Sequence, residues 1–369
     1  MLHKINSKVL IDEFLHQYGK ARAQLPYLLP KPLGYFLFIT GECNLDCVYC
    51  WQRHQEELPE ENGWINSTPR ALSTEEWIKV VEKLPRRSFI GISGGEATIS
   101  KSLLPVVKAA SRRHPISINT NLLSIKENEL EALTHNNVRN VSVSIDGFAD
   151  VHDKSRNRKG LFDKIVENIR IINEIKGNRK YPKITIKTVL LNENLESMPE
   201  FRHFCGNSLQ ANEINISFEK INEHRQFSLF HNSSLQKVLS ISKPALYPYE
   251  APDRVSLILQ DMLHKNISET CKLVIYPRMK NSRQIENFLA GKGENVYKPC
   301  YLPFSMMSVL PDGEVIPCLS ASMGNVKDFE YDIEATLKNG DYANFCNSLL
   351  NWQQLPPACN VCCFSTVSS

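Results

Sequence analysis

The chain has 369 residues, of which 42% are hydrophobic and 22% charged, the balance of an ordinary soluble globular protein. Its formal net charge is +3, and no block of Lys and Arg is long enough to form a nucleic-acid footprint. The N-terminus has no apolar signal core, and no apolar run is long enough to span a bilayer. We therefore expect a cytoplasmic protein without a nucleic-acid or membrane partner.

The first half of the chain alternates short β-like runs with helical ones, which is the pattern of parallel βαβ units. A helix over 8–22 comes first, and the segment Ser73-Thr74-Glu75-Glu76 is a capping box that starts another helix. We expect an α/β fold with a domain at 35–218, preceded by an N-terminal helical segment at 1–34. The predicted strands are 35–40, 88–93, 116–120, 138–145, 183–189 and 213–218, and a further amphipathic helix is predicted over 162–172.

The second half is less regular. Residues 219–298 contain a proline-bearing stretch and one predicted helix near 255–265, so we expect a helical bridge there. From residue 299 to 369 the sequence pattern changes, and a hairpin is predicted over 306–316 with Asp312-Gly313 as its turn. This last stretch is predicted to be a small separate domain.

The chain has eleven cysteines, and in a reducing compartment they are not expected to form disulfides. They are also unevenly placed along the chain. Two are isolated, Cys205 and Cys271, and are expected to be buried thiols. The others gather in two regions, so two metal sites are the simplest account. These are Cys43, Cys47 and Cys50, and then Cys300, Cys318, Cys346, Cys359, Cys362 and Cys363.

The first group has the spacing C-x3-C-x2-C and begins directly after the first predicted strand. Three thiolates this close can hold an iron–sulfur cube and leave one iron open to an outside ligand. The alternative is a closed zinc knuckle in which His54 is the fourth ligand.

Polar residues follow the next strands. Gly94-Gly95-Glu96 would let a ligand approach bare backbone, and its carboxylate can meet an ammonium group, which a zinc knuckle would not require. Asn121 either contacts a ligand or caps a turn. Arg156 has the fork that suits a carboxylate, with a surface salt bridge as the alternative.

With Tyr49 before the last cysteine, the triplet resembles the signature of the radical S-adenosylmethionine (radical SAM) superfamily. Gly94-Gly95-Glu96 is similar to the family's GGE motif, although Ala97 stands where proline is usual. Thr120-Asn121 is similar to its TN motif, with Leu122 in place of glycine. Ser144-Ile145-Asp146-Gly147 with His152-Asp153-Lys154-Ser155-Arg156 resembles the family's SxDG…HDxxR block.

The resemblance implies a partial (β/α)6 TIM barrel and a [4Fe-4S] cluster on Cys43, Cys47 and Cys50 whose open iron holds SAM. It implies that Glu96 binds the SAM amino group and that Asn121 contacts the ribose. Ser144 and Arg156 would bind the SAM carboxylate. The full set of implied cofactor-binding residues is Tyr49, Gly94, Gly95, Glu96, Asn121, Ser144 and Arg156.

The C-terminal cysteines resemble a twitch domain, a shortened SPASM module with an auxiliary [4Fe-4S] cluster. The implied ligands are Cys300, Cys318, Cys359 and Cys362, while Cys346 and Cys363 stay possible. A structural zinc ribbon is the alternative. A full SPASM module would need more closing cysteines than stand before Ser369.

The resemblance implies an enzyme that accepts an electron from flavodoxin or ferredoxin and cleaves SAM to a 5′-deoxyadenosyl radical. This radical takes a hydrogen atom from the substrate, and the auxiliary cluster oxidises the substrate radical. The preferred substrate is a ribosomally made peptide that is crosslinked or oxidised, although about forty residues before the first strand are too few for a winged-helix leader-recognition domain. The alternatives are a dehydrogenase of an aminocyclitol or sugar alcohol, and a non-enzymatic electron-transfer protein.

Overall fold

Parallel β-strands form the centre of the molecule. The computed structural model describes residues 8–24, 31–50, 71–219, 249–265, 270–277, 279, 281–290, 300–318, 321–338 and 341–351. Its strands belong to one nine-stranded sheet in the order β7-β6-β5-β4-β3-β2-β1-β8-β9. The strands are β1 (Gly34–Phe38), β2 (Phe89–Ser93), β3 (Ile116–Thr120), β4 (Val138–Ser144), β5 (Lys183–Leu190), β6 (Glu213–Phe218), β7 (Lys272–Tyr276), β8 (Met306–Val309) and β9 (Val315–Ile316).

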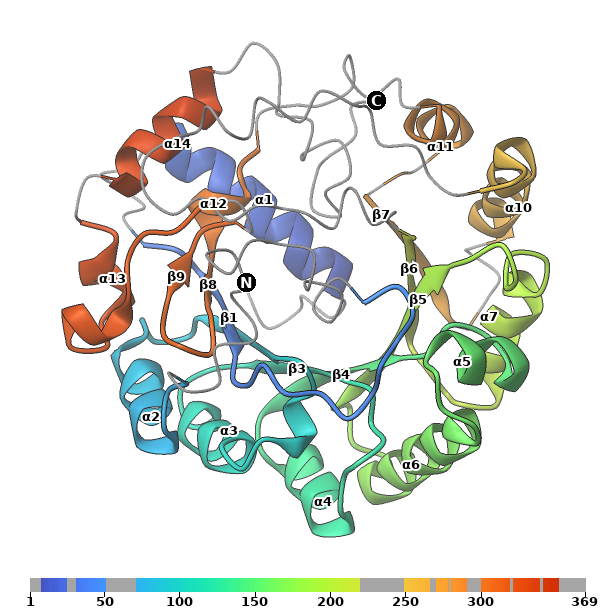
Figure 1. The fold of residues 1–369 in the computed structure, drawn as a ribbon, viewed down its shortest axis with the longest axis horizontal. Helices are drawn as coiled ribbons and strands as arrows, with labels where there is room; N and C mark the ends of the chain where they lie inside the picture. The colour runs from blue at the N-terminus through green and yellow to red at the C-terminus, as the bar shows by residue number, and fades with distance from the viewer. Residues whose placement is uncertain are drawn as a thin grey trace.

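The first six strands lie where the sequence predicts them and pair in parallel with their neighbours along the chain. Helices lie along the outer side of this arc of strands, as Figure 1 shows. The expected α/β fold of the partial-barrel type is therefore confirmed. The sheet is also larger than expected, because β7 lies in the stretch that was predicted to be a helical bridge and pairs in parallel with β6.

The C-terminal part of the chain extends the same sheet. Strand β8 pairs in parallel with β1, so Tyr35 lies beside Met307 although they are far apart in the sequence. Strand β9 returns antiparallel to β8 through the turn that holds Asp312-Gly313. Gly313 adopts a φ of +97°, a conformation that glycine tolerates and that explains the residue at this turn.

The helices begin and end at local signals. Helix α2 starts with a capping box in which the Ser73 hydroxyl accepts from Glu76 N and the Glu76 carboxylate accepts from Ser73 N. None of the described helices combines the length and the apolar composition that crossing a bilayer requires. The helices are α1 (Lys8–Gln24), α2 (Thr74–Lys83), α3 (Leu103–Ser111), α4 (Glu127–His135), α5 (Ala149–Ser155), α6 (Leu161–Lys176), α7 (Met198–Asn207), α10 (Pro252–His264), α11 (Ser282–Leu289), α12 (Leu302–Ser305), α13 (Ile333–Thr336) and α14 (Asp341–Asn351), with 3-10 turns η4 (Ala97–Ile99) and η7 (Val326–Phe329).

The two faces of the central strands differ in polarity. On one face Ile184, Ile186, Ile214 and Ile216 are completely buried in the hydrophobic core. Because side chains alternate along a strand, the residues between them face the inside of the arc, and these are polar on β4, β5 and β6. A parallel sheet that served packing alone would be apolar on both faces. The polar inner face therefore points to a binding role.

Candidate active site

The loop that carries Cys43, Cys47 and Cys50 follows β1 and packs closely against the glycine pair after β2. Gly95 N donates to Thr40 O at 2.8 Å, and Glu96 N donates to Glu42 O at 2.7 Å. A Cβ atom on Gly95 would lie 2.2 Å from Glu42 O. The paired glycines thus have a structural reason beyond ligand access, because they let the cysteine loop lie directly on the end of β2.

The Glu96 carboxylate is buried and holds the ends of two strands together. Its Oε1 accepts hydrogen bonds from Thr98 N, Thr98 Oγ1 and Thr120 Oγ1 at 2.9, 2.7 and 2.5 Å, and its Oε2 accepts one from Asn121 N at 2.6 Å. The residue therefore fixes the loop after β2 to the end of β3.

Asn121 connects this edge to the cysteine loop. Its Nδ2 donates to Asn44 Oδ1 at 2.8 Å, and its Oδ1 accepts from Leu123 N at 3.0 Å. The turn-capping role expected as one alternative is thus present in the structure. Leu122, which stands where the family has glycine, adopts a φ of +58° in this turn.

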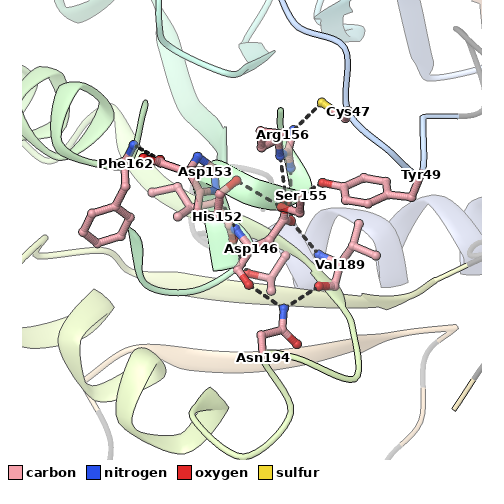
Figure 2. Close-up of polar contacts among 12 residues, drawn as sticks. Cys47, Tyr49, Asp146, His152, Asp153, Ser155, Arg156, Phe162, Val189 and Asn194 are labelled. Atoms are coloured by element: carbon pink, nitrogen blue, oxygen red, sulfur yellow. Dashed lines mark hydrogen bonds and ion pairs between the residues drawn. The ribbon is translucent and has the colours of Figure 1, made fainter. Parts of the chain in front are cut away.

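Asp146, just after β4, is the centre of a buried polar network (Figure 2). Arg156 donates to both of its oxygens, through Nε at 2.7 Å and Nη2 at 3.1 Å. Ser155 Oγ donates at 3.1 Å and the Tyr49 hydroxyl also donates. Burial alone would raise the pKa of the Asp146 carboxyl, but the charge and hydrogen bonds of Arg156 hold that pKa below its ordinary value.

Further contacts connect Asp146 to β5 and to the loop after it. Val189 N on β5 donates to Asp146 Oδ1 at 3.1 Å, and the side chain of Asn194, just after β5, donates to the Asp146 backbone carbonyl. Asp146 N donates to His152 Nδ1 at 3.1 Å, so the imidazole is an acceptor on that side. Burial lowers the pKa of His152 to about 4, so the ring is neutral near neutral pH.

The same network reaches the cysteine loop. Arg156 Nη1 donates to Cys47 Sγ at 3.8 Å, and its guanidinium carbon lies 5.4 Å from the centre of the Tyr49 ring. Val48 N donates to Ser155 O at 3.0 Å. The loop is therefore fixed from both sides, by the glycine pair after β2 and by the turn after β4.

The thiols of the loop fit an iron–sulfur cluster. Burial raises the pKa of Cys47 to about 11, with Arg156 opposing and the neighbouring Cys50 and Cys43 adding to the shift. Within the described part of the chain, no three metal-binding side chains are placed to hold one metal ion. A four-iron cluster does not require the three thiolates to converge on one ion, because each binds a different iron.

Three cysteines of the C-terminal group, Cys300, Cys318 and Cys346, lie in the described part of the chain. Burial raises the pKa of Cys300 to about 12, and the Cys318 and Cys346 thiols add to the increase. Cys346 lies on α14, one turn after Tyr342, whose hydroxyl donates to Pro303 O at 2.8 Å and so holds α14 against α12. Cys346 therefore stays a candidate ligand together with Cys300 and Cys318.

Several predicted residues lie elsewhere. Cys205 and Cys271 are completely buried, as expected for structural thiols. Ser144 is the last residue of β4 and lies beside Lys187 of β5. His54, Cys359, Cys362 and Cys363 lie outside the described residues.

Sequence reasoning gave no role to Asp146 or Asn194. Asp146 stands in the SxDG block, so its position after β4 was a signal that could have been used. Asn194 has no local motif, and only the fold places its side chain at the Asp146 carbonyl.

Comparison with protein families agrees with this geometry. Residues 37–205 match the radical SAM superfamily, and residues 300–363 match an iron–sulfur cluster-binding domain known as SPASM. These domains imply a SAM-binding [4Fe-4S] cluster together with auxiliary cluster binding.

Individual relatives share parts of the chain. The sporulation killing factor maturation protein SkfB of Bacillus subtilis is 30% identical over 54% of this chain and 44% of its own length. The GTP 3′,8-cyclase of Lactiplantibacillus plantarum is 26% identical over 46% of this chain and 49% of its own. The PqqA peptide cyclase of Bradyrhizobium diazoefficiens is 27% identical over 46% and 42%. The matched stretches thus span about half or less of these relatives.

Among solved structures, Streptococcus suis SuiB bound to S-adenosylmethionine has the same fold. It superposes with a TM-score of 0.61 at 14% identity and covers 94% of this chain and 74% of that one.

Proposed function

Because this chain is a radical SAM protein with a C-terminal cluster-binding domain, we propose that it modifies a ribosomally made peptide by crosslinking or oxidation. The observation that carries the radical SAM part is the three-cysteine loop braced by the Gly94-Gly95-Glu96 turn and by Arg156. The peptide part is supported by the names of two relatives, a killing-factor maturation protein and a peptide cyclase.

Cys43, Cys47 and Cys50 would hold the SAM-binding cluster. When bound and reduced by flavodoxin or ferredoxin, the cluster supplies the electron that cleaves SAM to methionine and a 5′-deoxyadenosyl radical, which takes a hydrogen atom from the substrate. Arg156 would direct an N–H toward the Cys47 thiolate, and such outer hydrogen bonds tune a cluster and orient its ligands.

The residues proposed to bind SAM keep hydrogen-bonding capacity after their internal contacts are counted. Glu96 Oε2 accepts one hydrogen bond, from Asn121 N, and has a second lone pair for the SAM ammonium. Arg156 has five N–H groups, of which three are engaged, so two are left for the SAM carboxylate, with Ser144 beside them in this proposal. Asn121 keeps one donor and one acceptor site for the ribose.

Cys300 and Cys318 would hold the auxiliary cluster with Cys359 and Cys362, and Cys346 is an alternative ligand, supported by its contribution to the raised pKa of Cys300. In this proposal the auxiliary site accepts the electron that the substrate radical loses. A small-molecule substrate, such as an aminocyclitol or sugar alcohol, is the second candidate, because one relative is named as a cyclase of GTP.

The proposal is tested by searching for a short peptide gene beside the gene of this protein and incubating that peptide with anaerobically reconstituted protein, the reductant and SAM. We expect 5′-deoxyadenosine and a peptide with altered mass. The triple variant Cys43→Ala/Cys47→Ala/Cys50→Ala should keep auxiliary iron but form no 5′-deoxyadenosine. Cys318→Ala should release 5′-deoxyadenosine without finished product. If a sugar alcohol is modified and the peptide is unchanged, the substrate is the small molecule named as the second candidate and not a peptide.

A further inference from the structure

The polar inner face of the sheet contains a row of side chains that satisfy one another. Thr185 Oγ1 on β5 donates to Asn140 Oδ1 on β4 at 2.8 Å. Asn140 Nδ2 in turn donates to Ser142 Oγ at 2.9 Å and to Ser117 Oγ at 3.3 Å. The hydrogen bonds of this row link β3, β4 and β5, and they explain how polar groups are accommodated at this level of the barrel.

Asn215 on β6 lies on the same inner face but has no such partners. The residue is 4% exposed, and neither its Oδ1 nor its Nδ2 makes a hydrogen bond with any residue that the structure describes. Burial of an amide without hydrogen bonds is unfavourable, and folded proteins leave few such groups. Ile214 and Ile216 on either side are buried in the core, so strand alternation turns Asn215 toward the inside of the arc.

The strand register places Asn215 at the level of the proposed SAM site. Ser144, the last residue of β4, pairs with Lys187 on β5, and Lys187 pairs with Asn215 on β6. This level is two residues before Asp146 and its network. Asn215 is thus level with the carboxyl end of β4, and the carboxyl ends of parallel strands form the ligand-binding end of such barrels.

Across the sheet, the inner face of β1 is apolar. Phe36 and Phe38 pack with ring centres 6.2 Å apart, and Gly91 on β2 leaves room for the Phe36 ring, which a Cβ atom would approach to 2.7 Å. The inner face therefore combines an aromatic side on β1 with a polar side on β4 to β6.

We propose that Asn215 binds a primary carboxamide of the substrate inside the barrel, such as an Asn or Gln side chain. The two unpaired atoms, one donor and one acceptor, favour this class. A carboxylate would accept from Nδ2 but leave Oδ1 without a donor, and an ammonium would do the reverse. A primary carboxamide presents its C=O and one N–H on the same edge and satisfies both atoms at once, whereas the C=O and N–H of a trans peptide bond point in opposite directions. Naming the carboxamide as a side chain of a peptide rests on the proposed function.

The first test uses the loss of stability that a buried amide without hydrogen bonds causes in the folded protein. Asn215→Leu keeps a similar volume and removes both polar atoms, so we expect the thermal midpoint of the SAM-free protein to rise by about 2 °C or more. Asn168→Leu is the matched control, because Asn168 is equally buried but donates to Leu122 O at 2.7 Å. That variant should melt at a lower temperature. A fall of the Asn215→Leu midpoint as large as that of the control would overturn the proposal.

The second test measures binding with small probes. Acetamide, acetate and ethylene glycol represent a carboxamide, a carboxylate and an alcohol, and contact with the reconstituted protein is followed by saturation-transfer NMR. We expect wild type to bind acetamide and Asn215→Leu to lose this contact, while SAM affinity changes less than about twofold. Binding of ethylene glycol in place of the amide, or a tenfold loss of SAM affinity in Asn215→Leu, would contradict the assignment. Absence of SAM cleavage by wild type would instead refute the proposed function. The thermal midpoint and the probe binding of Asn215→Leu could still be interpreted, because neither depends on SAM cleavage.

Discussion

The buried pair of Asp146 and Arg156 is expected to contribute strongly to stability, and Asp146→Asn tests this. The substitution keeps the shape of the side chain but removes the charge that faces Arg156 Nε at 2.7 Å and Nη2 at 3.1 Å. It leaves a guanidinium that is 10% exposed without a counter-charge. Breaking a buried ion pair in this way destabilises proteins by about 3–5 kcal/mol. We therefore expect a loss of roughly 3 kcal/mol or more.

The matched control is Glu196→Gln. Glu196 also pairs with an arginine, Arg254, through two contacts of 2.7 Å, but the two side chains are 63% and 49% exposed. An exposed pair contributes at most about 1 kcal/mol, so this variant should unfold nearly as wild type does.

Both variants would be unfolded anaerobically in urea and followed by far-ultraviolet circular dichroism, with the slope of the transition checked for constancy. In the double variant Asp146→Asn/Arg156→Met, part of the lost stability should return, because the unpaired charge is gone. Equal losses in Asp146→Asn and Glu196→Gln would refute the reasoning, since burial would then have no effect on the strength of the pair.

Three further results are expected. Burial lowers the pKa of His152 from 6.5 to about 4, so between these pH values the unfolded chain binds a proton that the folded chain does not. The contribution of His152 to the free energy of unfolding should be complete above pH 6.5 and should fall by up to about 3 kcal/mol as the pH drops to 4. Urea titrations at each pH should show this dependence in wild type and not in His152→Asn. Gly95→Ala should reduce the iron retained on the first site, because its Cβ would lie 2.2 Å from Glu42 O. Gly160→Ala, which meets no neighbouring atom but strains the backbone at a φ of +74°, controls for strain away from the loop and should keep its iron; equal retention would show that the loop can move. Cys300→Ser should lose iron from the auxiliary site while Cys346→Ser and the control Cys205→Ala keep it, and loss of iron in Cys346→Ser would make Cys346 a ligand in place of one of the proposed four.

The local pattern of the chain determined much of the fold. Each of the first six strands is a short run that is apolar or alternates apolar with polar residues, and each was predictable because strand formation there depends on residues that are neighbours in the sequence. The cysteine triplet and the motifs after β2 and β4 were equally readable, since the chemistry of each lies within a few consecutive residues.

Other features depend on segments that meet only in the folded chain. Strand β7 was not predicted, because its run Lys272–Tyr276 is too short to be recognised without its partner β6. Strand β8 was expected in a separate domain, yet it pairs with β1 more than 260 residues earlier, a contact that no local periodicity encodes.

The site shows the same division between local pattern and tertiary contact. The sequence indicated that Arg156 would meet a carboxylate, but only the fold shows that Asp146 is one that it meets, because the turn after β4 brings the two side chains together in a buried space. Likewise, Asn215 is an ordinary polar residue in the sequence. Its burial, and the lack of any partner for its amide, result from the curvature of the sheet and the register of β4, β5 and β6, which depend on long-range packing.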